Sequence, residues 1–188
     1  ITAELKDGET ARAAGTDAGH YTMGLTEDSF EVTSDNYSNL KVVVVDGYLD
    51  IQPDATEQTV TITGNNASRV YNKQKQTVEG YTTDVGTRTI KVDMAEGSAA
   101  KASGTNAGHY TMGLTEEDFS VTSANYSNIK VVVVAGYLDI TPITEEVTVT
   151  ISGNKLVTPY SGDEQTIEGY TTDVTDPTIK VELADGEE

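Results

Sequence analysis

Two histidines, His20 and His109, are the residues best suited to chemistry, and each directly precedes a tyrosine, Tyr21 or Tyr110. An imidazole can act as a general base or a metal ligand, and an aromatic ring can stack on a sugar. However, no Ser, Asp or Glu stands at a nucleophile spacing around either histidine, and a metal site needs several ligands. We therefore expect no enzymatic activity. The four residues are candidates for a ligand or interface surface, and the alternative is that each histidine simply faces solvent on a strand.

Acidic residues form a second candidate site. Asp46, Asp50, Asp54 and Glu57 lie close together in the sequence, and clustered carboxylates are the ligands that calcium prefers. The chain contains no calcium loop of the form D-x-[DN]-x-[DN]-G. We expect no organic cofactor, and bound calcium stands as an alternative to a solvated acidic surface.

The charge and composition exclude several classes of protein. The chain has 12 Lys and Arg against 31 Asp and Glu, which gives a net charge of −19. Nucleic-acid binders need clustered basic residues, so no nucleic-acid partner is expected. The absence of cysteine excludes disulfides, thiolate nucleophiles and Cys-ligated metals. No apolar run approaches the roughly 20 residues of a membrane-spanning helix, so we expect no membrane span in this sequence.

A tandem repeat organises the whole chain. Shifting the sequence by 89 residues aligns residues 1–89 with 90–178 without a gap, and 53 of the 89 positions are identical. We call two positions that are 89 residues apart equivalent. The blocks AGHYTMGLTE, KVVVV, GYLDI and EGYTTDV each occur twice. This period is too long for a solenoid coil and fits a small self-contained domain.

The frame of the repeat follows from its linker-like segments. Residues 53–58 and 142–147 both follow an apolar run, contain Pro and carry acids, as linkers between domains do. This places one complete domain at 54–142, the C-terminal half of a repeat at 1–53 and the N-terminal half of a repeat at 143–188. The alternative frame is 1–89 followed by 90–178.

Short strand patterns dominate each repeat. We expect strands at 20–23, 40–45, 48–51, 59–63, 76–82 and 90–94 and at the equivalent positions, a turn at Gly64-Asn65, and a single helical turn at 26–30. Asp46-Gly47 favours a bulge in one long strand over a hairpin, because the equivalent Ala135 suits a tight turn poorly. The pattern indicates an all-β fold of tandem Ig-like β-sandwich repeats, with a β-grasp-like small sheet domain as the alternative.

The order of the motifs resembles a known family. TVTITGN, TVEGYTTDV, GTNAGHYTMGLTEEDF and NYSNIKVVVVAGYLDITP follow one another through residues 54–142 and continue into both flanking halves. This order is similar to the MBG-type repeats found in tandem in large surface proteins of gut Gram-positive bacteria. The resemblance implies an extracellular, wall-associated or adhesin-type protein, and it brings no catalytic residues.

These observations predict a non-catalytic structural repeat that acts as a stalk or adhesin segment on a bacterial cell surface. The alternative is a carbohydrate- or protein-binding module with a host glycan or protein as its ligand. The expected partners are neighbouring repeats of the same protein. Because the halves at 1–53 and 143–188 are complementary pieces of one domain, we also expect them to pair head-to-tail between chains and to form filaments.

Overall fold

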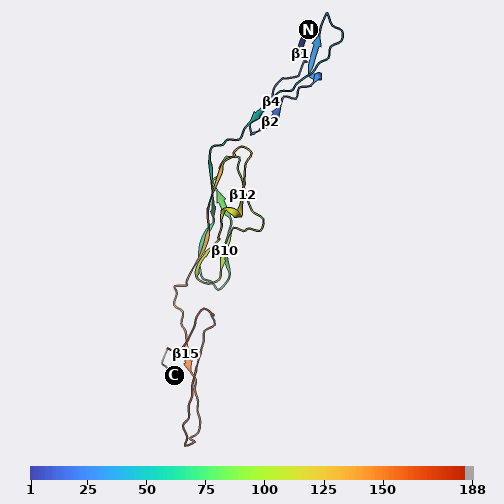
Figure 1. Cartoon of the computed structure of the whole chain (residues 1–188). Helices are drawn as coiled ribbons and strands as arrows, with labels where there is room; N and C mark the ends of the chain where they lie inside the picture. The colour runs from blue at the N-terminus through green and yellow to red at the C-terminus, as the bar shows by residue number, and fades with distance from the viewer. Residues whose placement is uncertain (185–188) are drawn as a thin grey trace.

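The chain is extended along one axis and consists of short β-strands and loops (Figure 1). The structure is a computed structural model that describes residues 1–184, so the last four residues of the predicted half repeat 143–188 lie outside it. Three parts follow one another along the axis: the N-terminal segment (1–53), the central segment (54–142) and the C-terminal segment (143–184). The all-β prediction is confirmed.

The two end segments contain few regular elements. They are β1 (Thr2–Leu5), β2 (Gly19–Thr22), the 3₁₀ turn η1 (Glu27–Ser29), β3 (Phe30–Thr33) and β4 (Tyr48–Ile51) in the N-terminal segment, and β15 (Ile151–Gly153) and β16 (Tyr170–Thr172) in the C-terminal segment.

The central segment contains the remaining elements. They are β5 (Gln58–Gly64), β6 (Asn66–Val70), β7 (Gln76–Glu79), β8 (Tyr81–Thr83), β9 (Lys91–Met94), β10 (Lys101–Gly104), β11 (Gly108–Thr111), the 3₁₀ turn η2 (Glu116–Asp118), β12 (Phe119–Thr122), β13 (Ile129–Val134) and β14 (Tyr137–Thr141). Both 3₁₀ turns lie where the sequence predicts a single helical turn.

Two long bent strands run side by side through the central segment. β13 pairs in parallel with β5, and β14 pairs in parallel with β6. β13 and β14 pair with different strands rather than with each other, so the interruption at 135–136 is a bend, as the sequence favours. The predicted turn at Gly64-Asn65 is wrong, because the chain continues through it into β6.

Glycines permit this bend. A Cβ atom on Gly64 would collide with the backbone nitrogen of Gly136, and a Cβ atom on Gly136 would collide with the carbonyl oxygen of Asn65. The two backbones therefore approach more closely than any side chain allows, which is a known use of glycine within strands.

The buried core belongs to the central segment and draws on both of its halves. Val60, Ile62 and Leu138 are completely buried. Val60 and Ile62 lie on one face of β5, beside Val131 and Val133 of the neighbouring strand β13, in agreement with the alternation predicted for residues 59–63. The buried apolar residues are Val60, Ile62, Val78, Ile90, Ala102, Met112, Leu114, Phe119, Leu138 and Ile140.

The end segments repeat the same sequences without the same partners. Residues 40–45 differ from β13 only by Leu in place of Ile, yet they form no strand, and of the predicted strand 148–152 only the last two residues do. Leu49 is 37% exposed whereas the equivalent Leu138 is 0% exposed, and Ile151 is 57% exposed whereas the equivalent Ile62 is 0% exposed. The strand prediction fails at these positions because a strand needs a paired neighbour in addition to its own pattern.

The two equivalent glycines of the bend provide a stability prediction. We expect Gly136→Ala to lower the free energy of unfolding by about 2 kcal/mol or more, because two backbones must move apart. Gly47→Ala meets only the flexible Met23 side chain, with its sulfur 2.8 Å away, and we expect a change within about 0.5 kcal/mol. Urea unfolding of the dilute full chain measures both, and equal losses would contradict the paired bend.

Candidate functional site

The first candidate site is a cross-strand cluster around His20. The antiparallel register of β2 and β4 places His20 opposite Asp50, and the His20 Nδ1 and Asp50 Oδ1 atoms lie 2.5 Å apart. The imidazole also packs against Tyr48, with ring centroids 4.8 Å apart and an interplanar angle of 37°. All three side chains are exposed.

The same cluster recurs one repeat later. His109 Nδ1 lies 2.6 Å from Asp139 Oδ1, and the imidazole lies 5.0 Å from the Tyr137 ring at 38°. One copy belongs to the complete central segment and the other to the N-terminal segment. The geometry is therefore set locally by each strand pair rather than by the surrounding core.

The predicted tyrosines do not join these histidines. Strand alternation sends Tyr21 and Tyr110 to the opposite face, where each ring covers a glycine, Gly15 or Gly104. The Tyr21 hydroxyl donates to the Asp17 carbonyl oxygen at 2.9 Å, and Tyr110 makes the equivalent bond at 2.9 Å. These hydroxyls hold their own loops in place.

The geometry of the two clusters allows each of them to orient a ligand. The carboxylate fixes one imidazole nitrogen and leaves the other free. Among residues 1–184, no hydroxyl side chain hydrogen-bonds to either imidazole. A cavity of about 350 Å³ beside His20 and Asp50 also touches Ala124 of the central segment. This cavity therefore lies where two segments meet.

The predicted calcium ligands have separate partners. Asp46 accepts the backbone N–H groups of Gly24 and Leu25, both at 2.9 Å, and the Leu25 bond is the largest cause of the lowered pKa of Asp46. Asp54 accepts the Thr56 N–H at 2.8 Å, and Asp50 faces His20. Over the described part of the chain, no three His, Cys, Asp or Glu side chains converge as a metal site would require. Glu57 is exposed.

Asn125 connects the N-terminal and central segments. Its Oδ1 accepts the Ala18 N–H at 2.6 Å, and its Nδ2 donates to Asp17 Oδ1 at 2.7 Å and to Thr89 Oγ1 at 2.8 Å. One amide side chain thus bridges a loop of the first segment to the second. A bidentate contact of this kind fixes orientation as well as distance.

Asp176 connects the central and C-terminal segments. Its carboxylate accepts the Tyr71 hydroxyl at 3.3 Å and lies 3.4 Å from the Lys73 ammonium. The Thr178 hydroxyl donates to it at 2.7 Å and the Thr178 N–H at 3.0 Å. The Thr178 hydroxyl, then its N–H and then Lys73 lower the pKa of Asp176 to about 2.

Repeat comparison alone does not reveal these joints. The residue equivalent to Asp176 is Thr87, and the residue equivalent to Lys73 is Gly162. Neither partner of this contact is repeated, so a comparison of the two repeats cannot find it. Asn125 is repeated as Asn36, but nothing in the pattern distinguishes a bridging Asn from a turn Asn. Asp50 and Tyr48 stand in the repeated GYLDI block, and only the strand register places them beside His20.

Comparisons with models of known protein families, with curated proteins and with solved structures found no match. The part of the chain that the structure describes includes no helix long and apolar enough to cross a membrane.

The Asp176 contact predicts a pH-dependent joint. Its folded-state pKa of about 2 lies below the ordinary 3.8, so the Thr178 hydrogen bonds and, to a lesser extent, the Lys73 ion pair stabilise the folded chain above about pH 4, and this stabilisation is lost as the pH falls through 2. We expect Thr178→Val to raise the pKa of Asp176 toward 3.8, and Lys73→Met to raise it by less. NMR titration of the Asp176 carboxyl carbon measures these values, and a wild-type midpoint near 3.8 would contradict the contact.

Proposed function

We propose that the chain is a non-catalytic structural segment of an extracellular bacterial surface protein, in which tandem Ig-like β-sandwich repeats act as a stalk or adhesin spacer. The observation that carries this proposal is the pair of polar joints at Asn125 and Asp176, which connect three segments arranged end to end (Figure 1). Side-chain contacts across each joint limit bending, and limited bending is what a spacer requires.

The composition supports the same proposal. A net charge of −19 keeps an extended chain soluble and discourages lateral aggregation. A chain without cysteine needs no oxidising folding machinery outside the cell. The resemblance to MBG-type surface repeats points to the same setting.

A labelling experiment tests whether the first joint is rigid. Because the chain has no cysteine, single spin labels can be placed at the equivalent exposed positions Asp28 and Glu117. We expect a narrow distance distribution in the wild-type chain and a broader one in Asn125→Ala, since that variant loses three hydrogen bonds across or beside the joint. Asn36→Ala, at the equivalent exposed position, is the matched control and should change nothing. A broad wild-type distribution would favour a flexible tether instead.

A binding module is the second candidate function. The observation that favours it is the His–Asp–Tyr cluster, which occurs twice with nearly the same geometry and with an exposed imidazole in both copies. Its two copies would present one ligand surface per repeat to a glycan or a protein. Glycan-array binding that is lost in His109→Ala would favour this function over the spacer.

A further inference from the structure

We propose that the C-terminal segment of one molecule and the N-terminal segment of a second molecule pair as the two halves of the central segment do, and so complete a domain between chains. This inference goes beyond the spacer function and does not depend on it. The central segment supplies the template, because its halves 54–89 and 90–142 are equivalent to 143–178 and 1–53.

Each end segment already has the internal pairing of the half that it matches. In the N-terminal segment, β1 pairs with β3 as β9 pairs with β12, and β2 pairs with β4 as β11 pairs with β14. In the C-terminal segment, Ile151 lies opposite Thr172 on β16 as Ile62 lies opposite Thr83 on β8. The β2–β4 and β15–β16 pairs, which the contact keeps, are therefore preorganised for docking.

Only the contacts between halves are missing. In the central segment these are the parallel pairs of β5 with β13 and of β6 with β14, and the antiparallel pair of β7 with β10. When each residue of the β5–β13 pair is replaced by its equivalent in the end segments, Val42 lies opposite Val149 and Val44 lies opposite Ile151. The third pair places Arg12 opposite Glu168, where the central segment has the ion pair of Lys101 and Glu79 at 2.7 Å.

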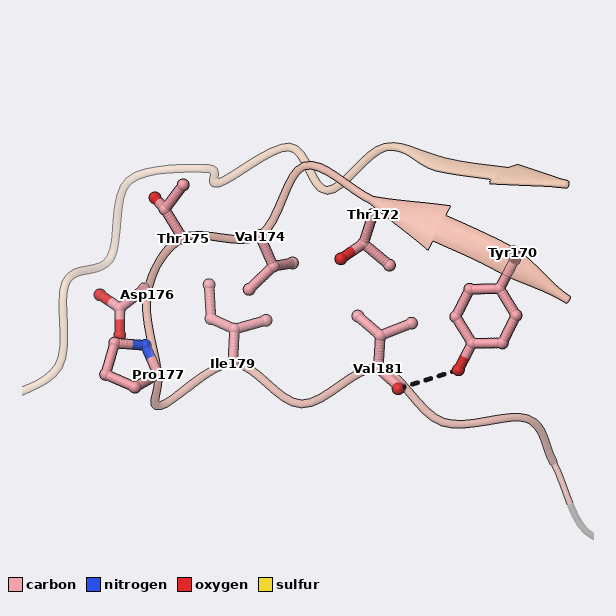
Figure 2. Close-up of a pocket in the computed structure, with 8 residues that line it drawn as sticks. All are labelled: Tyr170, Thr172, Val174, Thr175, Asp176, Pro177, Ile179 and Val181. Carbon is pink, nitrogen blue, oxygen red and sulfur yellow. Dashed lines mark hydrogen bonds between the residues drawn. The ribbon is translucent and has the colours of Figure 1, made fainter. Parts of the chain in front are cut away.

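Each of the two faces contains a pocket. A pocket of about 400 Å³ in the C-terminal segment has Val174 and Ile179 on opposite walls, and Tyr170 closes one end by donating to the Val181 carbonyl oxygen at 3.1 Å (Figure 2). The N-terminal segment has an apolar pocket of about 290 Å³ that includes Phe30.

The central segment indicates what fills the first pocket. There, the equivalent of Phe30 is Phe119, whose ring meets the edge of Tyr81 at 5.0 Å and 75°. Phe119 is buried in the same apolar cluster as Val85 and Ile90, the equivalents of Val174 and Ile179. Phe30 of a second molecule therefore fits the pocket beside Tyr170.

The pairing joins different molecules because the central segment separates the two faces along the axis (Figure 1). Residues 1–184 carry a different face in each end segment, so a contact between two copies is heterologous and can repeat. One strand becomes redundant in each contact, since residues 1–5 and 179–183 are both equivalent to residues 90–94, which contain β9. β1 is the strand that is released, because all four of its residues are exposed and Val181 matches Val92, which packs against the core, better than Ala3 does.

Two glycine variants test the pairing without disturbing the isolated molecule. Gly153 has open space around the position of a Cβ atom, whereas the equivalent Gly64 touches the backbone of Gly136. Gly153→Ala should therefore leave the monomer unchanged and abolish association, and Gly47→Ala should do the same at the other face. Ser152→Ala, next to Gly153, is the matched control.

Sedimentation velocity of the full chain across a concentration series measures the association. High salt is used because two molecules of net charge −19 repel each other. We expect wild type and Ser152→Ala to form a growing series of oligomers, and each glycine variant alone to remain monomeric. In an equal mixture of the two variants, the C-terminal face of Gly47→Ala and the N-terminal face of Gly153→Ala are both intact and can pair. The other two faces are altered, so association should stop at the dimer. A monomeric wild type, unaltered association in either glycine variant, or a mixture without dimers would overturn the proposal.

Discussion

The fold depends on one interaction, the parallel pairing of two bent strands that are distant in the sequence. The Tyr137 N–H donates to Asn66 Oδ1 at 3.0 Å across a separation of 71 residues, beside the point where Gly64 and Gly136 bring the two backbones together. Where both bent strands are present, the apolar residues between them are buried. Where one of the two strands is missing, the equivalent apolar side chains are exposed to solvent, as Leu49 and Ile151 show.

This dependence explains which parts of the fold the sequence predicts. Alternating Thr and apolar residues predict the position of β5, and the exact spacing of 89 predicts which residues are equivalent. Pairing between distant segments has no local signature, so the parallel partners could not be predicted. Gly64-Asn65 has the composition of a turn, but the chain only bends there and continues into β6, where Gly64 meets the backbone of Gly136.

The candidate site also has a part that the sequence predicts and a part that it does not. The repeated histidines are visible in the sequence, but strand register decides their neighbours, so Asp50 and Tyr48 replace the predicted Tyr21. The joints depend on single side chains, Asn125 and Asp176, that meet across segments. A pattern within one repeat contains no information about such contacts. The frame of 54–142 with two flanking halves stays a prediction that unfolding of the isolated segments can test.

Hydrogen exchange of the dilute full chain tests most directly whether partner strands, and not the sequence itself, determine this fold. Residues 40–45 and 129–134 have almost the same sequence, and peptides extended to Asp46 or Ala135 differ in mass. If pairing with β5 forms the strand, amides of 129–134 should exchange slowly and those of 40–45 rapidly, since an unpaired backbone lacks protection. Equal exchange in the two peptides would contradict this account.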